Sequence, residues 1–212
     1  MEMSDFGSAA DALRNLLNPE ICVCHAQWED FSIDETASDG RGQVNLSSKY
    51  PCIHVMRMDK HVFPVLKNQK CADHLVLLHD PEHNAWGLHI FELTKTVSNS
   101  KWQDKILPQF SGGLANAWAI SGVLRLPRFS AVTAHCCYRF DGNRTSPVEM
   151  RTETGKKAKD NWTEGTTIRL EEFPGLSIHK SLLRLDEESG KLDLEQPLDF
   201  IGVENRNERE GA

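Results

Sequence analysis

The sequence predicts an α/β fold in which a central mixed sheet is flanked by helices. Two runs at residues 75–78 and 88–91, apolar apart from His89, have the length of strands, and the segment between them contains Pro81 and Asn84, as a hairpin turn does. Strands that are apolar along their whole length are buried on both faces, which implies a sheet covered by helices. A helical pattern and a further strand-like run at residues 130–138 follow, an order typical of α/β proteins.

The size and composition of the chain suit one folded domain. It has 212 residues, an apolar fraction of 39% and five tryptophans, which suffice for a hydrophobic core. We expect a single α/β domain over residues 1–200, with its core at about 50–140, and a disordered tail over residues 201–212. No apolar run reaches the ~18 residues of a membrane span, and the acidic N-terminus lacks the layout of a secretion signal. The expected location is the cytoplasm.

Charge and cysteine content narrow the function classes. A formal net charge of −7 argues against a protein that coats nucleic acid through bulk positive charge. The negative net charge is still compatible with an enzyme that binds nucleic acid through a local basic rim. A metal site adds carboxylates to the chain, and the bound cation compensates their charge. The six cysteines are scattered, and spacings such as Cys22-x-Cys24 differ from those of zinc sites. We interpret them as small buried residues.

The elements before the apolar hairpin follow from local patterns. Residues 5–17 show the apolar spacing of a short helix, and residues 34–49 have the polar, glycine-containing composition of a loop. Residues 52–58 predict a strand, which Pro64 confines to an edge if it continues. After the central region the sequence predicts a long loop and two more strands, at residues 139–165, 166–170 and 178–185.

The helical pattern after the hairpin begins at Ser98, a residue type that caps helix N-termini. From Trp102 to Trp118, apolar residues recur every three or four positions and mark one face of a helix. Pro108 should kink or split this helix. The pair Gly112-Gly113 weakens a helix, so its presence indicates a close approach to a neighbouring element.

Four polar residues around the hairpin and this helix are the candidate site. Asp73 opens the first apolar strand, Glu92 ends the second, Lys95 follows, and Gln109 lies on the helix. Two carboxylates on paired strands can form a rigid site for a hard divalent cation. Taken singly, each residue also has an ordinary structural explanation, such as a turn residue or a surface charge.

In order and spacing these residues resemble the PD-(D/E)xK nuclease superfamily over about residues 50–125. The matching pieces are Asp73, the segment Ile90-Phe91-Glu92-Leu93-Thr94-Lys95, and Gln109. The resemblance implies a restriction-endonuclease-like core in which Asp73 and Glu92 hold Mg²⁺ or Mn²⁺ for phosphodiester hydrolysis, with Lys95 and Gln109 completing the catalytic set. It further implies a nucleic-acid substrate, DNA in preference to RNA, a role in defence or repair, and a homodimer or a partner in a larger system.

One departure from the family pattern concerns the lysine. The position two residues after Glu92 is Thr94, and Lys95 comes one residue later. Side chains alternate between the faces of a regular strand, so Lys95 would point away from Glu92 unless a β-bulge restores its direction. Without a bulge, Thr94 takes the place of the lysine and catalysis should be weak or absent.

Two other functions therefore stay open at this stage. The chain could be a catalytically inactive member of the same fold that binds or regulates, or an unrelated α/β interaction protein in which Asp73 and Glu92 are structural. The histidines, including His74 and His89 beside the carboxylates, lack the spacing of a known zinc motif. The basic segment at residues 156–159 could contact a nucleic-acid backbone or be a solvated loop.

Overall fold

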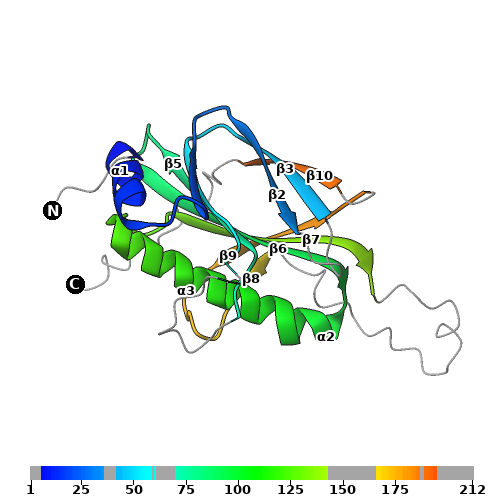
Figure 1. Ribbon diagram of the computed structural model, residues 1–212. Helices are drawn as coiled ribbons and strands as arrows, with labels where there is room; N and C mark the ends of the chain where they lie inside the picture. The colour runs from blue at the N-terminus through cyan, green and yellow to red at the C-terminus, as the bar shows by residue number, and fades with distance from the viewer. Residues whose placement is uncertain are drawn as a thin grey trace, which may run out of the picture.

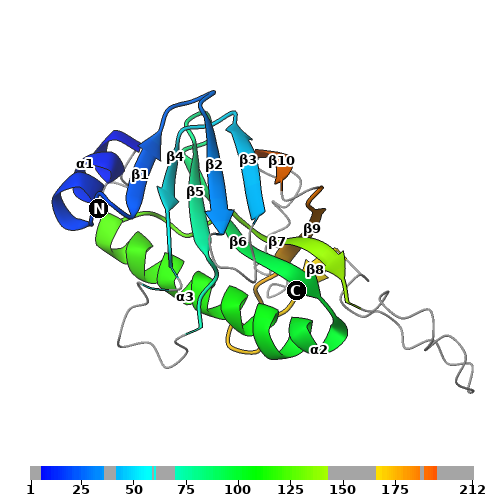
Figure 2. The same ribbon diagram turned by 45° about the vertical axis from the view of Figure 1, so that its right-hand side comes forward.

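The computed structural model describes residues 6–35, 42–58, 60, 70–142, 166–186 and 189–194. These residues form a large mixed sheet, a smaller second sheet and a helical layer (Figures 1 and 2). In both views the long helix α3 lies across one face of the main sheet, and the second sheet lies on the opposite face. The fold is α/β, and its central sheet is mixed, as the sequence predicts.

The main sheet has seven strands in the order β1-β4-β5-β6-β7-β9-β8. Their bounds are Cys22–His25 (β1), Cys52–Val55 (β4), His74–Asp80 (β5), Ala85–Val97 (β6), Ala131–Asp141 (β7), Ile178–Arg184 (β9) and Thr167–Ile168 (β8). β6 pairs with β7, and β7 with β9, in parallel; the other neighbours are antiparallel. The predicted hairpin is thus β5–β6, and the helix between β6 and β7 makes the crossover that a parallel pair requires.

The second sheet has three strands in the order β10-β3-β2, with bounds Ser189–Leu194 (β10), Gly42–Ser48 (β3) and Asp30–Glu35 (β2). Val44 and Leu46 of β3 are buried against Val76, Leu78 and Phe91 of the main sheet. One face of the central sheet is therefore covered by another sheet, where the sequence had suggested helices on both faces. The apolar side chains of a strand must be buried from water, and packing against the apolar face of a second sheet buries them as well as packing against a helix does.

The helical layer consists of α1 (Phe6–Leu16) and a continuous run of α2 (Asn99–Lys101), the π-helical turn η1 (Trp102–Ile106) and α3 (Leu107–Leu124). The Ser98 hydroxyl accepts a hydrogen bond from the Lys101 backbone N–H, which confirms the expected start. Pro108 lies at the beginning of α3 and does not end the helical run, because the wider π turn comes directly before it. Among the described residues, no helix is both long and apolar enough to cross a bilayer.

The loop predicted over residues 34–49 is wrong where the structure describes β2 and β3. In β3 the side chains alternate between buried and exposed positions, a period of two that identifies a strand. Only two of its buried positions, Val44 and Leu46, are apolar, so the alternation is too short to stand out in a polar, glycine-containing segment. Several predicted features lie outside the described residues, namely the continuation at 61–66, most of the loop at 139–165 with its basic segment, and the tail.

Candidate functional site

Asp73 lies immediately before β5 and is held against β6. Its backbone N–H donates to the Phe91 carbonyl at 3.0 Å, and its carboxylate Oδ2 accepts from the Leu93 N–H at 2.7 Å. These two bonds lie on either side of Glu92 in sequence. Because His74 pairs with Phe91, Asp73 stands opposite Glu92 at the end of the hairpin, where the two side chains share a face of the sheet.

Glu92 lies on the helix-facing side of β6 and is 1% exposed. Its Oε1 is 3.6 Å from the Lys105 ammonium, and its Oε2 has no hydrogen-bond partner among the described residues. Burial, and next the negative charge of Asp73, raise the pKa of Glu92 well above its ordinary value, while Lys105 acts in the opposite direction and Glu35 of β2 adds to the rise. The carboxyl is therefore held toward its neutral form unless a further cation approaches.

Lys105 reaches Glu92 from the π-helical turn η1, and its side chain is half exposed. This lysine was not among the residues that the sequence singled out. A signal for it was present, because Lys105 precedes Gln109 by four residues and side chains at that spacing lie on one face of a helix. What the sequence does not show is that this face meets Glu92.

The π turn is connected to the strand that carries Asp73. Lys70 donates from its ammonium to the Asp104 carbonyl at 3.0 Å. Asp104 is four residues before Pro108, which has no N–H to donate to that carbonyl in a regular α-helix. The lysine thus satisfies the carbonyl that the proline cannot bond, and it links η1 to the segment before β5.

Gln109 is 8% exposed and lies at the start of α3, against the chain just ahead of Asp73. Its backbone carbonyl accepts from the Ala72 N–H at 3.1 Å, and its side-chain Nε2 donates to the Cys71 carbonyl at 3.4 Å. The side-chain Oε1 is buried and has no hydrogen-bond partner in the part of the chain that the structure describes. Gln109 therefore helps to position Asp73 and leaves an oxygen unused.

Lys95 is not part of this cluster. It is exposed, while Thr94 is 3% exposed. On β6, Thr94 pairs with Tyr138 and Thr96 with Phe140 of β7, so the register is the same on both sides of Lys95 and contains no bulge there. By alternation, Thr94 shares the face of Glu92 and Lys95 lies on the other face. The structure brings together Asp73, Glu92 and Gln109 but not Lys95.

Four histidines form two pairs on the other face of the main sheet, next to the second sheet. His54 Nε2 and His74 Nδ1 are 3.0 Å apart, and His89 Nδ1 and His135 Nε2 are 2.8 Å apart. Burial is the main cause that lowers the pKa of His54 to about 2 and that of His89 to about 4, and it lowers the pKa of His135 as well. The rings of His54, His89 and His135 are therefore neutral parts of the core at physiological pH.

The fit of a divalent cation can be judged from the donors at Asp73 and Glu92. No group of three or more His, Cys, Asp or Glu side chains suited to hold a metal ion occurs among the described residues. Mg²⁺, however, is usually bound through one or two carboxylates together with waters and substrate phosphates. The facing carboxylates of Asp73 and Glu92, with Glu92 Oε2 unpartnered among the described residues, are donors that suit such a cation.

Comparison with known proteins assigns no relative: no protein-family model, curated protein or solved structure matches the chain. The arrangement of Asp73, Glu92, Lys105 and Gln109 is therefore the basis for inferring a function.

Proposed function

We propose that this chain is a metal-dependent, nuclease-like protein with a restriction-endonuclease-like core that hydrolyses phosphodiester bonds, in DNA in preference to RNA. The observation that carries the proposal is the meeting of Glu92 with Asp73 on one side and the Lys105 ammonium on the other, at the end of the β5–β6 hairpin. A buried carboxylate pair beside a half-exposed cation suits a phosphate diester, which needs both a metal site and a positive group.

Each residue has a defined part in this proposal. Asp73 and Glu92 would hold Mg²⁺ or Mn²⁺, which supplies charge for the phosphate and lowers the pKa of a bound water. Lys105, which is exposed to solvent on one side, would receive the anionic backbone and orient the water near Glu92. Gln109 holds the Cys71–Ala72 backbone and through it the position of Asp73.

A cleavage assay with matched lysine variants tests this assignment. Plasmid and single-stranded DNA are incubated with Mg²⁺, Mn²⁺ or EDTA. We expect cleavage with either metal and none in EDTA, and a loss of at least about 100-fold in rate for Lys105→Ala, because a group that stabilises transition-state charge is removed. Lys95→Ala is the control: it removes a nearby exposed lysine on the opposite face and should leave the rate unchanged. Cleavage that persists in EDTA or in Glu92→Gln contradicts the proposal.

Cation binding can be measured apart from cleavage. Titration calorimetry with Mn²⁺ should show saturable binding to the wild-type chain and none to Asp73→Asn, because that change removes a charge but keeps the shape of the side chain. The absence of saturable Mn²⁺ binding to the wild type would indicate a structural carboxylate pair and, with it, an α/β interaction protein.

A catalytically inactive binding module is the second candidate function. It is favoured by Thr94, which occupies the buried position two residues after Glu92, with its hydroxyl bonded to the Thr96 carbonyl at 3.3 Å. In that case the wild type should bind DNA and Mn²⁺ without cutting under any of the metal conditions. Thr94→Lys should then restore cleavage, whereas it should only perturb a site that already uses Lys105.

A further inference from the structure

A pocket of about 570 Å³ lies on the helix-facing side of the main sheet, beside the C-terminal half of α3. Its walls come from α3, from the connection between α3 and β7, from Val132 at the start of β7 and from Leu176 in the loop between β8 and β9. The volume falls within the range of about 300–1,000 Å³ that is usual for sites of small ligands. None of the residues proposed above for cleavage is among those that line it.

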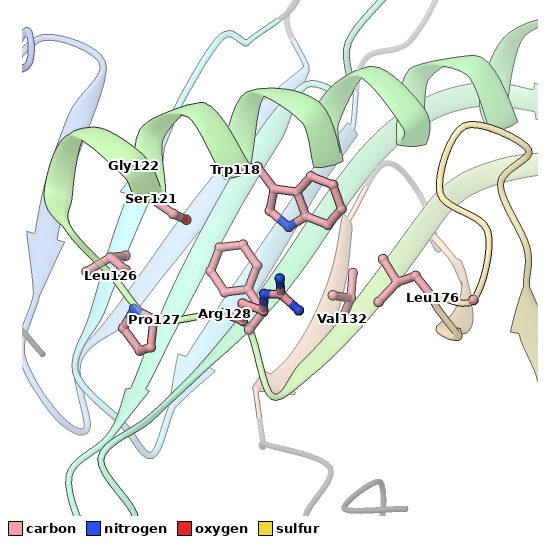
Figure 3. A pocket seen from close by; sticks show the side chains of 10 residues that line it. Trp118, Ser121, Gly122, Leu126, Pro127, Arg128, Val132 and Leu176 are labelled. Atoms are coloured by element: carbon pink, nitrogen blue, oxygen red, sulfur yellow. The ribbon is translucent and has the colours of Figure 1, made fainter. Parts of the chain in front are cut away.

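The pocket presents aromatic rings and one cation. Trp118 is 47% exposed, although the other large apolar residues of α3 from Phe110 to Leu124 are mostly buried. Its ring and that of Phe173 are nearly perpendicular, at 89°, with 4.8 Å between the centroids, a T-shaped contact. Figure 3 shows the Trp118 indole and the Arg128 guanidinium directed into the same space. Arg128 is exposed and is the single charged residue among the described residues that line the pocket.

Glycine use indicates that the pocket is kept open. A Cβ on Gly112 or Gly113 would collide with neighbouring protein atoms, so packing explains those two residues. A Cβ on Gly122 would meet nothing within 4 Å. Gly175 also lines the pocket, but its φ of +86° already favours glycine there. A glycine inside a helix costs about 0.5–1 kcal/mol relative to alanine. Gly122 therefore carries a cost that no contact within the described protein explains, and its effect is to leave room in the pocket.

We propose that this pocket binds one unpaired nucleobase of a nucleic-acid strand, stacked on Trp118, with Arg128 on the adjoining phosphate. This inference rests on the proposed function. A planar ring with a neighbouring negative charge matches an exposed indole close to the Arg128 guanidinium, for which no ion pair is found among the described residues. Stacking of a base on an aromatic ring tolerates any base. Trp118 is nine positions after Gln109, about 14 Å farther along the helix axis, and at 3.6 residues per turn the two side chains leave α3 on opposite sides.

Binding to a metal-free protein tests the pocket without cleavage. In EDTA, the affinity for a 12-nucleotide single-stranded DNA is compared with that for a strand of equal length made only of abasic sites. Trp118→Ala should weaken binding of the intact strand roughly 5- to 150-fold, because stacking is lost, and should leave binding of the abasic strand unchanged. Trp118→Phe should restore most of the affinity. Trp28→Ala removes another exposed tryptophan, at the turn between β1 and β2, and should have no effect.

Arg128 has a separate readout. Arg128→Gln should reduce the slope of log affinity against log salt by about 0.7, the value for one phosphate contact on a single strand, and Arg128→Lys should keep it. Circular dichroism of each variant confirms that the fold is intact.

Three outcomes would overturn the pocket proposal: no binding of single-stranded DNA, an equal loss for intact and abasic strands, or an equal effect of Trp28→Ala. Cleavage with Mg²⁺ by the same preparations reports on the proposed function independently. Cleavage without a Trp118 effect rejects the pocket alone, and Trp118-dependent binding without any cleavage rejects the catalytic proposal alone.

Discussion

The two halves of helix α3 lie over the same sheet but have opposite surroundings. Phe110, near its start, is fully buried, and Gly112 is so close to the segment before β5 that a Cβ would lie 1.6 Å from the Lys70 carbonyl oxygen. Near its end, Trp118 is half exposed and Gly122 borders open space. The first half is sealed and holds buried polar groups in place; the second half leaves a pocket. One helix thus serves both as a support for a polar cluster and as the wall of a cavity.

The largest expected effect is a difference in stability between alanine variants of the two aromatic residues, Phe110 and Trp118. Phe110→Ala should lower the free energy of unfolding by about 3–5 kcal/mol, because it creates a cavity in the core. Trp118→Ala should cost much less, since nearly half of that side chain is already in water. Urea unfolding of both variants measures the difference. Equal losses would show that the two halves of the helix are packed alike.

Gly112→Ala should have the next largest effect and lower the free energy of unfolding by about 3 kcal/mol. The added methyl group would collide with backbone atoms of Lys70 and Cys71, which cannot rotate away as a side chain does. Because those atoms precede Asp73, Mn²⁺ binding should weaken as well. Thermal unfolding together with the Mn²⁺ titration checks this expectation, and an unchanged melting temperature contradicts it.

Removing the charge of Glu92 should change the free energy of unfolding by an intermediate amount, and the size of the change should depend on pH. The pKa of Glu92 is raised in the folded protein, so between its ordinary value of 4.5 and that raised value the folded state holds a proton that the unfolded state has lost. Stability contributed by this group therefore falls as pH rises above 4.5. Without metal, Glu92→Gln should be more stable than the wild type by about 1–3 kcal/mol at neutral pH, the range for a buried polar group that lacks a partner.

That prediction concerns the difference between the variant and the wild type at each pH. The total stability also contains the buried histidines, whose pKa values are lowered and act with the opposite sign: stability falls as pH drops below 6.5 toward about 4, the value for His89. Urea unfolding from pH 4.5 to pH 8 should show the Gln variant gaining on the wild type as pH rises. A constant gap would mean that Glu92 ionises in the fold as it does in water. Saturating Mg²⁺ should reduce the gap, because only the wild type gains binding energy.

The smallest change in the free energy of unfolding is expected from Gly122→Ala. This change should stabilise the protein by about 0.5–1 kcal/mol, since alanine is the better helix former and meets no other atom. The methyl group would also narrow the pocket, so single-stranded DNA should bind more weakly. Thermal unfolding and anisotropy measure the two effects. A loss of stability would show that the pocket half of α3 is as crowded as the first half.

Local patterns predicted much of the scaffold. The β5–β6 hairpin and the close approach at Gly112-Gly113 are confirmed, and so is the helical face from Trp102 to Ala117. Trp118, which the same pattern placed on that face, is 47% exposed. Each confirmed feature depends on residues a few positions apart, whose apolar spacing or conformational cost can be recognised in the chain itself. The second sheet was missed because β3 has only two apolar buried residues, Val44 and Leu46, and because its parallel partner β10 lies far along the chain.

The sequence by itself determined that two carboxylates, Asp73 and Glu92, stand at one end of a buried hairpin, because strand pairing and alternation place them there. Only the tertiary structure decided which cation meets them. The unbroken register of β6 with β7 turns Lys95 away, and the π turn before Pro108 brings Lys105 to within 3.6 Å of Glu92. Such a contact depends on how a helix sits on a sheet, and no local periodicity encodes that geometry.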